Sequence, residues 1–290
     1  RLRFLVERRP DGELRIAFAD LGWETASLRN LSLLSLLVWA LAMVGLFFVS
    51  LVLSSVALRP AERAWQQQRQ FVADASHELK TPLTVILANT GLVLSHPEDT
   101  EAAQSKWLEY THDEAEQMKG LVDDLLFLAK SDAARQPAAR AETAISEVAL
   151  GCLLPFESVA FESGVALEHR ITLGLSLRGD EGQLRRLVMI LLDNAVKYAG
   201  PGGTVTLTLE RHQERLRLAV HNTGEPIPPE HLPHLFERFY RADAARNRSG
   251  GGYGLGLAIA RSIVEGHHGR LTVTSTAAAG TTFTALFPRR

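Results

Sequence analysis

The 290-residue sequence has almost no cysteine and almost no excess of charge of either sign. Its single cysteine, Cys152, excludes an internal disulfide framework and is typical of a reducing compartment. It lies in the apolar run G-C-L-L-P-F, which favours a small core residue over a nucleophile. Because 31 Lys and Arg balance 33 Asp and Glu, to a net charge of -2, we expect no nucleic-acid partner. His231, His234, His267 and His268 have no partners at metal-ligand spacing.

Charged residues are also absent from positions 30–58, which are mostly apolar. A transmembrane helix needs about 20 such residues. The segment lacks the small-residue cleavage site of a signal peptide and the regularly spaced polar positions of a buried soluble helix. We therefore predict that residues 30–58 span a membrane. Arg59, Arg63 and Arg69 favour a cytoplasmic C-terminal side, although Arg29 flanks the other end.

Two short segments flank this predicted span. Residues 1–29 are largely polar and carry a hairpin signal, Pro-Asp-Gly between two runs that alternate as strands. We expect them to be the end of an extracytoplasmic segment, with further sequence upstream because the first residue is Arg1 rather than Met. Residues 59–70 are expected to form a short helical linker, in which Pro60 suits the first turn of a new helix.

The stretch F-V-A-D-A-S-H-E-L-K-T-P-L-T, which begins at Phe71, combines an apolar helix face with a polar one. Phe71, Ala75, Leu79 and Leu83 are four residues apart and therefore share a face. His77 is two residues from both Ala75 and Leu79, so it points away from that face.

On this exposed side, His77, Glu78 and Thr81 bring an imidazole, a carboxylate and a hydroxyl together. A nucleophile beside an acid/base group on a rigid helix suits catalysis. The same residues also fit an ordinary surface histidine with solvated neighbours. This stretch alone does not choose between the two interpretations.

Two amphipathic helices are predicted over residues 71–132. The first carries His77 and ends near residues 95–97, since a proline disfavours helical geometry at the residue before it. The second, over about 102–131, has a heptad seam of apolar positions three and four apart. The seam consists of Leu108, Thr111, Ala115, Met118, Val122, Leu125 and Ala129, widened by Leu121 and Leu128. Two antiparallel helices cannot bury such broad faces alone, so we predict a homodimeric four-helix bundle.

An alanine-rich linker from Ser131 to Ala144 leads into a second domain, residues 145–290. Here short β-type runs alternate with helices. The expected strands are at 165–171, 175–179, 204–211, 215–221, 271–276 and 282–288. The expected helices cover about 181–198, with Asp180 as N-cap, and 255–267. This pattern predicts an α/β sandwich that is large enough for its own core.

Two stretches of the second domain carry candidate ligand groups. L-L-D-N-A-V-K-Y places Asn194, Lys197 and Tyr198 within one helical turn. An amide oxygen can ligate Mg²⁺ beside phosphates and a lysine can neutralise phosphate charge, although a solvated helix end has the same residues. In V-H-N-T-G-E-P-I-P, Asn222 ends a strand and could face a base edge, while Gly224 permits close backbone approach.

A glycine-rich loop comes directly before the last predicted helix, with glycines at positions 250, 251, 252, 254 and 256. Bare backbone N–H groups at a helix N-terminus form an anion cradle. The loop is not of the Rossmann type, because no strand immediately precedes it, and no G-K-[ST] follows as in a Walker loop. A flexible hinge is the alternative interpretation.

These motifs together resemble those of bacterial two-component sensor histidine kinases. His77 with its flanks, N-A-V-K-Y, N-T-G-E-P-I-P, F-E-R-F-Y-R, G-Y-G-L-G-L-A-I and G-T-T-F follow the family's order and spacing from about Arg59 to the C-terminus. The resemblance implies a transmembrane helix, a dimeric antiparallel four-helix bundle with two helices per chain, and an α/β sandwich ATP-binding domain of the gyrase, Hsp90 and MutL type. The interval between Leu58 and Phe71 has no room for the usual HAMP-type relay module.

The resemblance assigns roles to three residues of the first predicted helix. It implies that His77 accepts the γ-phosphoryl group of ATP through an imidazole nitrogen. It implies that Glu78 orients the ring and accepts its proton. Thr81 matches the family position that helps to place water when the bundle dephosphorylates a partner.

The resemblance also implies a nucleotide site, with Asn194 as a Mg²⁺ ligand, Lys197 as a phosphate contact and Tyr198 as a wall near the nucleotide. The expected site comprises Asn194, Lys197, Tyr198, Asn222, Gly224, Arg241, Gly252, Tyr253, Gly254, Leu255, Gly256 and Thr281. The implied cofactors are ATP and Mg²⁺.

In the F-E-R-F-Y-R motif the resemblance implies two kinds of contact. Phe236 and Phe239 match the hydrophobic anchor of the family's mobile lid, whereas Gly252, Gly254 and Gly256 match the loop over the phosphates. Arg238 and Arg241 match positions that could steady the transferring phosphoryl group, whose chemistry depends mostly on positioning and charge neutralisation.

Three positions depart from the family pattern. Asn222 stands where an Asp often accepts from the adenine amine, and an amide oxygen can accept in the same way without charge. Pro226 replaces a glycine and stiffens the turn. Ile190 stands where kinases often have Asn and related ATP hydrolases have a water-activating Glu, so this residue favours a kinase over an ATPase.

The function implied is autophosphorylation on His77 with Mg-ATP and transfer of the phosphoryl group to an aspartate of a response regulator. The resemblance also implies that the kinase can dephosphorylate this regulator. The expected partners are that regulator, a second copy of the chain and the membrane. The expected location is a bacterial inner or plasma membrane, with the kinase domains in the cytoplasm. Two alternatives remain. One is a degenerate kinase that only binds ATP to regulate a partner, and the other is a protein that acts mainly as a phosphatase of the response regulator.

Overall fold

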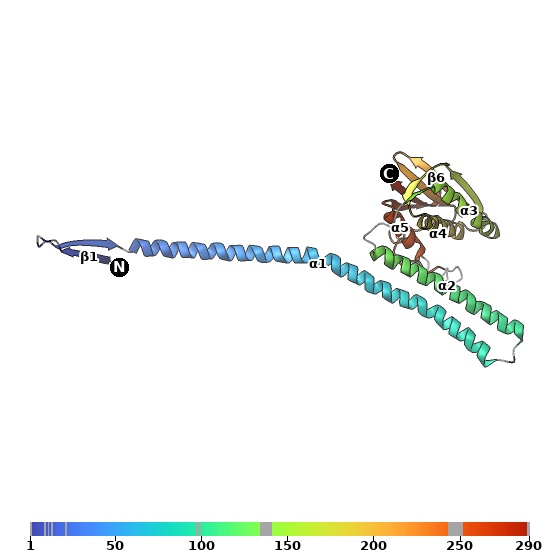
Figure 1. Cartoon of the computed structure of the whole chain (residues 1–290), viewed down its shortest axis with the longest axis horizontal. Helices are drawn as coiled ribbons and strands as arrows, with labels where there is room; N and C mark the ends of the chain where they lie inside the picture. Colours follow the sequence, from blue (N-terminus) through green and yellow to red (C-terminus); the bar gives the residue numbers. More distant parts are fainter. Residues whose placement is uncertain are drawn as a thin grey trace. The chain divides into compact units, whose positions relative to one another are not determined.

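The computed structural model describes residues 2–8, 10, 12, 14–20, 22–96, 98, 100–133, 141–242 and 252–288 (Figure 1). The chain divides into two compact units, Arg1–Gln70 and Phe71–Arg290. Helix α1, Gly22–Ser95, begins in the first unit and ends in the second.

The first unit begins with an antiparallel hairpin of β1 (Leu2–Arg8) and β2 (Leu14–Asp20), as the Pro-Asp-Gly signal predicts. Among the described residues one helical segment, Ala26–Ser54, is long and apolar enough to cross a membrane by length and composition. Its mean hydropathy is 2.7, and none of it is buried against other parts of the protein. This segment overlaps the predicted span at 30–58.

The expected helix start at Pro60 is wrong, because α1 continues through this position. A proline inside a helix removes one backbone hydrogen bond and costs about 3 kcal/mol. Good helix formers follow it in the run W-Q-Q-Q-R-Q, so helix propagation on both sides outweighs this local cost.

The second unit begins with the remainder of α1 and continues with α2, Glu101–Ala133, which runs antiparallel beside it (Figure 1). Helix α1 ends at Ser95, as predicted. The heptad residues of α2 divide into two groups: Leu121 and Leu128 are each 1% exposed, whereas Leu108 and Val122 remain 53% and 39% exposed. A single chain therefore leaves part of the apolar seam uncovered.

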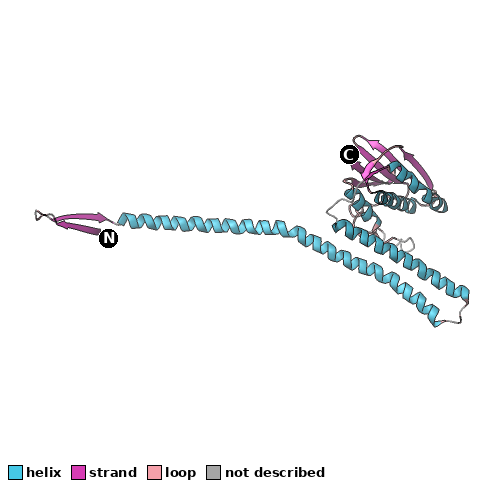
Figure 2. Cartoon of the chain, in the orientation of Figure 1, coloured by secondary structure: helices cyan, strands magenta, loops and turns pink. Residues whose placement is uncertain are grey.

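The C-terminal domain is a two-layer α/β sandwich, as predicted (Figure 2). Its sheet has the order β4-β6-β7-β9-β8, in which only the β4–β6 pair is parallel. The strands are β4 (Ala166–Ile171), β6 (Thr204–His212), β7 (Arg215–Asn222), β8 (Arg270–Thr276) and β9 (Gly280–Pro288). Burial alternates along β6 and β9, which marks one core-facing side. Helices α3 (Ile145–Glu162), α4 (Glu181–Ala199) and α5 (Gly256–Gly266) pack against it.

The predicted linker from Ser131 to Ala144 is wrong at both ends. Helix α2 extends to Ala133, and Ala141–Thr143 forms strand β3, which pairs with β5 (Leu177–Gly179). The hydroxyl of Thr143 donates to the carbonyl of Gly179 at 3.0 Å. The partner of β3 lies 36 residues away, so no local pattern marks this strand. Positions 134–140 lie outside the described residues.

Cys152 is a core residue, as its apolar context predicts. Its side chain is 0% exposed, and burial raises the pKa of its thiol, an effect that the nearby Arg185 opposes. A buried thiol in this state is unreactive.

His267, to which the sequence assigns no role, joins two helices in the core. It is 6% exposed, and its Nδ1–H donates to the carbonyl of Ile263 at 2.7 Å. The backbone N–H of Asp180 donates to Nε2 of the same ring at 3.0 Å. Asp180 itself caps α4 by accepting from the N–H of Gln183, as predicted. His267 thus links the end of α5 to the start of α4.

Replacing His267 with Ala is expected to lower the stability of the second unit by about 2–4 kcal/mol, because a buried donor at Asp180 loses its acceptor and a cavity forms. The measurement is thermal unfolding of the detergent-solubilised full chain, followed by circular dichroism. His268→Asn is the matched control, since this neighbour is exposed and has a φ of +58° that Asn tolerates. Equal melting of the His267→Ala variant and the wild type would contradict the assignment.

Candidate active site

One face of α4 carries the first group of predicted site residues. Ile190, Asn194 and Lys197 are spaced by four and three residues, so they lie along the same side of the helix. Leu187, Leu191 and the other buried residues of α4 face the sheet, which fixes the rotation of the helix. Tyr198 adjoins this face, and the Lys197 ammonium lies 5.8 Å from the centre of its ring.

The carboxyl end of β7 brings the second group together. Asn222 pairs with Thr281 across the β7–β9 ladder, and both are buried, at 2% and 4% exposure. The Asn222 amide NH₂ donates to the carbonyl of Thr223 at 2.7 Å, which leaves its oxygen as the atom that can accept from an adenine amine. The Thr281 hydroxyl lies 2.7 Å from that of Ser275, a residue for which the sequence offers no signal.

Gly224 joins these two groups. Its φ is +129°, and a Cβ at this position would lie 2.3 Å from the carbonyl oxygen of Tyr198 and 3.3 Å from that of Ala199. Only glycine permits such an approach between the turn after β7 and the end of α4. The structure therefore brings Asn222 and Tyr198 to one site.

The glycine loop covers the same face of α4. A Cβ on Gly252 would lie 3.6 Å from Lys197 Nζ, and a Cβ on Gly256 would lie 3.4 Å from Ile190 Cγ2. Leu255 is 1% exposed and anchors the start of α5 in the core. Positions 250 and 251 of the predicted loop lie outside the described residues.

Two cations meet beside this loop. Burial lowers the pKa of the Lys197 ammonium, Asp193 acts in the opposite direction, and the Arg241 guanidinium lowers it further. Like charges in proximity are stabilised by an anion between them, and a phosphate group is suitable. The side-chain amide of Asn194, on the same face, is half-buried. Its oxygen is a suitable ligand for Mg²⁺, which phosphate oxygens and waters would coordinate as well. The residues present therefore fit a magnesium–phosphate ligand.

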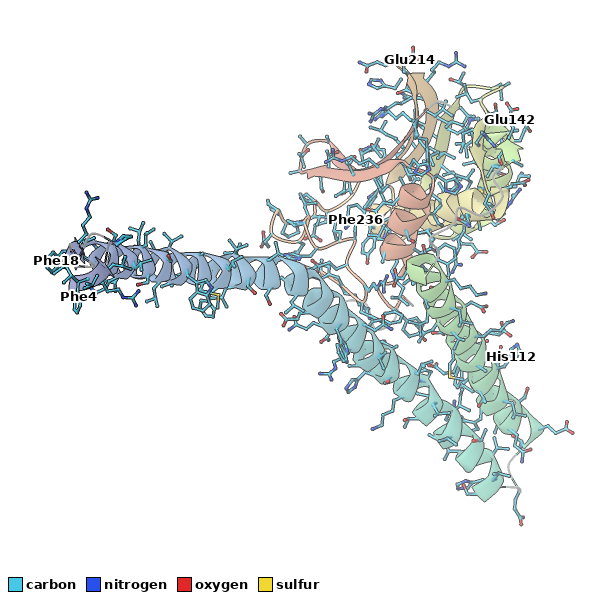
Figure 3. The ribbon with its side chains drawn as sticks, turned by 60° about the vertical axis from the view of Figure 1, so that its left-hand side comes forward. Phe4, Phe18, His112, Glu142, Glu214 and Phe236 are labelled. Atoms are coloured by element: carbon cyan, nitrogen blue, oxygen red, sulfur yellow. The ribbon has the colours of Figure 1, made fainter. Side chains whose placement is uncertain are left out.

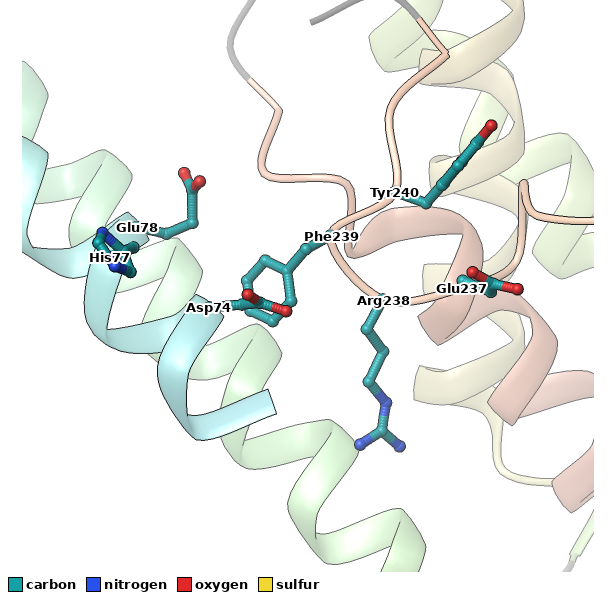
Figure 4. A pocket seen from close by; sticks show the side chains of 7 residues that line it. All are labelled: Asp74, His77, Glu78, Glu237, Arg238, Phe239 and Tyr240. Carbon is teal, nitrogen blue, oxygen red and sulfur yellow. The ribbon is translucent and has the colours of Figure 1, made fainter. Parts of the chain in front are cut away.

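His77 lines a cavity of about 320 Å³ between α1 and the segment that precedes the glycine loop (Figure 4). Asp74, His77 and Glu78 line it from α1. Glu237, Arg238, Phe239 and Tyr240 line it from the C-terminal domain. Thr81, one helical turn beyond His77, is exposed and does not line this cavity.

The two phenylalanines of the F-E-R-F-Y-R motif anchor different surfaces. Phe236 packs against the core, with its ring 6.4 Å from that of Phe283. Phe239 turns toward α1, with its ring 6.1 Å from that of Phe71. Phe239 also has a φ of +61°, a strained conformation that is concentrated at functional sites in proteins.

Arg238 is held by the helical pair. Its guanidinium donates to the two carboxylate oxygens of Asp132 at 2.7 and 2.9 Å and lies 5.0 Å from the centre of the Phe71 ring. In Figure 4 its side chain points away from His77. Nothing in the sequence around Asp132 predicts this contact, because its two residues are 106 positions apart.

Comparison with known proteins agrees with this arrangement. Residues 67–134 match the family "His Kinase A (phospho-acceptor) domain", and residues 179–290 match "Histidine kinase-, DNA gyrase B-, and HSP90-like ATPase". Sensor histidine kinase RppB of Synechocystis sp. is 36% identical over 250 residues, covering 83% of this chain and 53% of RppB. Sensor histidine kinase YkoH of Bacillus subtilis is 38% identical over 242 residues, covering 83% and 52%.

A solved structure, full-length ShkA in complex with AMPPNP, is similar with a TM-score of 0.58 and 26% identity, covering 76% of this chain and 45% of ShkA. The chain spans about half the length of the relatives RppB and YkoH. The two family matches and relatives that are more than 30% identical over 83% of this chain agree, and the chain therefore belongs to the sensor histidine kinases.

Proposed function

We propose that this chain is a protein-histidine kinase that phosphorylates His77 with Mg-ATP and passes the phosphoryl group to an aspartate of a response regulator. The observation that supports this most directly is the cavity in which His77 and Glu78 face the segment leading to the glycine loop. A nucleophile, a neighbouring carboxylate and a phosphate-binding loop are the parts that phosphoryl transfer to histidine requires.

The nucleotide site has a place for each part of ATP. The Asn222 oxygen accepts from the adenine amine, while Lys197 and Arg241 neutralise the phosphates under the glycine loop. The structure of ShkA contains AMPPNP, which is consistent with this assignment. Mg²⁺ held by Asn194 would neutralise phosphate charge.

The exposed part of the α2 seam supports a homodimer. Leu108 and Val122 are apolar and uncovered in one chain, so a second copy would bury them in a four-helix bundle. The exposed apolar segment Ala26–Ser54 supports anchorage in a bacterial membrane, with the kinase domains in the cytoplasm. The segments 1–29, 30–58, 59–70 and 71–132 remain our proposed divisions of the chain, and the last division, 145–290, is extended to include strand β3.

Three residues favour particular activities. Ile190 packs beside Gly256 and cannot activate water, so the site favours transfer to histidine over ATP hydrolysis. Thr81 and Glu78 lie one turn apart on the exposed side of α1, which supports a second activity, dephosphorylation of the regulator.

The direct test is incubation of the full chain in detergent micelles with [γ-³²P]ATP and Mg²⁺. We expect an acid-labile, base-stable label, which a chelator prevents. Asn194→Ala is expected to reduce the label to background, because the Mg²⁺ ion that neutralises the phosphates loses its protein ligand. Gln183→Ala, at the opposite end of α4, is the matched control and is expected to retain the label. A full label in the Asn194→Ala variant would contradict the metal assignment.

A further inference from the structure

The acceptor histidine and the nucleotide loop that faces it belong to the same chain. Three residues of α1 and four consecutive residues of the C-terminal domain enclose one cavity (Figure 4). All of the described residues that line this cavity come from α1 and the C-terminal domain of one chain. The geometry therefore bears on which His77 in a dimer each ATP site can reach.

The cavity wall opposite His77, residues 237–240, is hydrogen-bonded to the glycine loop. The backbone N–H of Phe239 donates to the carbonyl of Gly254 at 3.0 Å. Gly254 has a φ of +71°, and a Cβ there would lie 2.8 Å from the backbone of Phe239. The cavity wall and the phosphate loop are therefore fixed to each other, and a nucleotide bound under the loop is held beside the cavity.

Several contacts hold the domain against its own helices. Arg238 binds Asp132 near the end of α2, and the Ser131 and Ser262 hydroxyls lie 2.5 Å apart. Arg186 of α4 also forms an ion pair with Asp124. Single exposed ion pairs contribute little stability, about 0–1 kcal/mol each. As a group they define one docked position, since they join α2 to three separate segments of the domain.

The charges around Tyr253, between Gly252 and Gly254, agree with this position. Burial raises the pKa of its phenol, and the carboxylates of Glu114 and Glu78 raise it further. The loop residue therefore lies in the field of the carboxylate next to His77 on its own chain.

From this geometry we infer that each chain of the dimer phosphorylates its own His77. The inference rests on the proposed kinase function. In the transfer, the unprotonated imidazole nitrogen of His77 forms a bond to the γ-phosphorus of ATP. The bond from that phosphorus to the β,γ-bridging oxygen breaks, and ADP leaves with its electron pair. The proton on the other imidazole nitrogen passes to the Glu78 carboxylate and then to water.

The test uses two co-expressed full-length copies that carry different affinity tags and migrate differently on a gel. Heterodimers are isolated on the two tags in sequence and incubated with [γ-³²P]ATP and Mg²⁺. The short copy is wild type and the long copy carries Asn194→Ala, which removes its ATP site and keeps its His77. Transfer within a chain labels the short copy, whereas transfer between chains labels the long one, so both mechanisms give a positive signal.

We expect label confined to the short copy. Label on the long copy, alone or together with the short one, would overturn the inference. Gly254→Ala in the long copy, where a Cβ has no room, is a second way to disable its ATP site and is expected to give the same result. A heterodimer of two wild-type copies is expected to label both. If it labels neither, the proposed kinase function fails, and this inference fails with it.

Discussion

Replacing His77 with Gln is expected to reduce the label from [γ-³²P]ATP to background while ATP binding is unchanged. A carboxamide has no basic nitrogen that can attack phosphorus, so the covalent product cannot form. His77 is exposed within α1, and Gln is a good helix former of similar reach, so the helix should persist. The measurements are acid-labile incorporation of ³²P and displacement of a fluorescent ATP analogue from the same preparation.

His112→Gln is the matched control for this variant. His112 is also exposed and also helical, but it lies on α2 (Figure 3) and does not line the cavity. We expect it to incorporate label as the wild type does. Persistent acid-labile label in the His77→Gln chain would show that another histidine is the acceptor.

Replacing Gly224 with Ala is expected to give the second largest effect, a loss of ATP affinity of at least about tenfold, or about 1.4 kcal/mol. Ala at a φ of +129° is strained, and its Cβ would lie 2.3 Å from the Tyr198 carbonyl oxygen. The backbone fixes the position of this Cβ, and the oxygen belongs to the backbone itself, so no side-chain rotation relieves the clash. The turn must move away from α4, which separates Asn222 from Lys197. Isothermal titration of the full chain with ATP measures the loss.

Gly174→Ala separates backbone strain from displacement of the site. Gly174 also has a positive φ, of +72°, but a Cβ there would have no neighbour within 4 Å. We expect this variant to lose about 1 kcal/mol of stability and to bind ATP as the wild type does. Equal losses of affinity in the two variants would mean that the site responds to general destabilisation rather than to the position of α4.

Many local elements of the second unit follow from the sequence, although helix α3 was not expected. Asp180 caps α4 as predicted, and the alternating runs at 204–211 and 215–221 form the paired strands β6 and β7. Spacing along one helix also grouped Asn194 with Lys197. These features depend on interactions between residues a few positions apart, and such interactions are visible in any single stretch.

The seam of α2 was predicted only in part. Its periodicity identified an apolar seam, but it could not tell which seam positions pack within the chain. Leu121 and Leu128 are buried by the chain itself, whereas Leu108 and Val122 are left for another surface. The difference depends on where the C-terminal domain docks, which a helical period does not encode.

The sequence by itself determined the family, the helical pair and the α/β sandwich, and it predicted the residues that we propose for a nucleotide site. Tertiary structure alone decided that Arg238 binds Asp132, that His267 accepts from Asp180, and that the segment before the glycine loop faces His77 across a cavity. The physical reason is distance along the chain, since the first two contacts span 106 and 87 residues. Helical and strand periods record neighbours within about one turn, and only the folded path of the backbone brings such remote groups together.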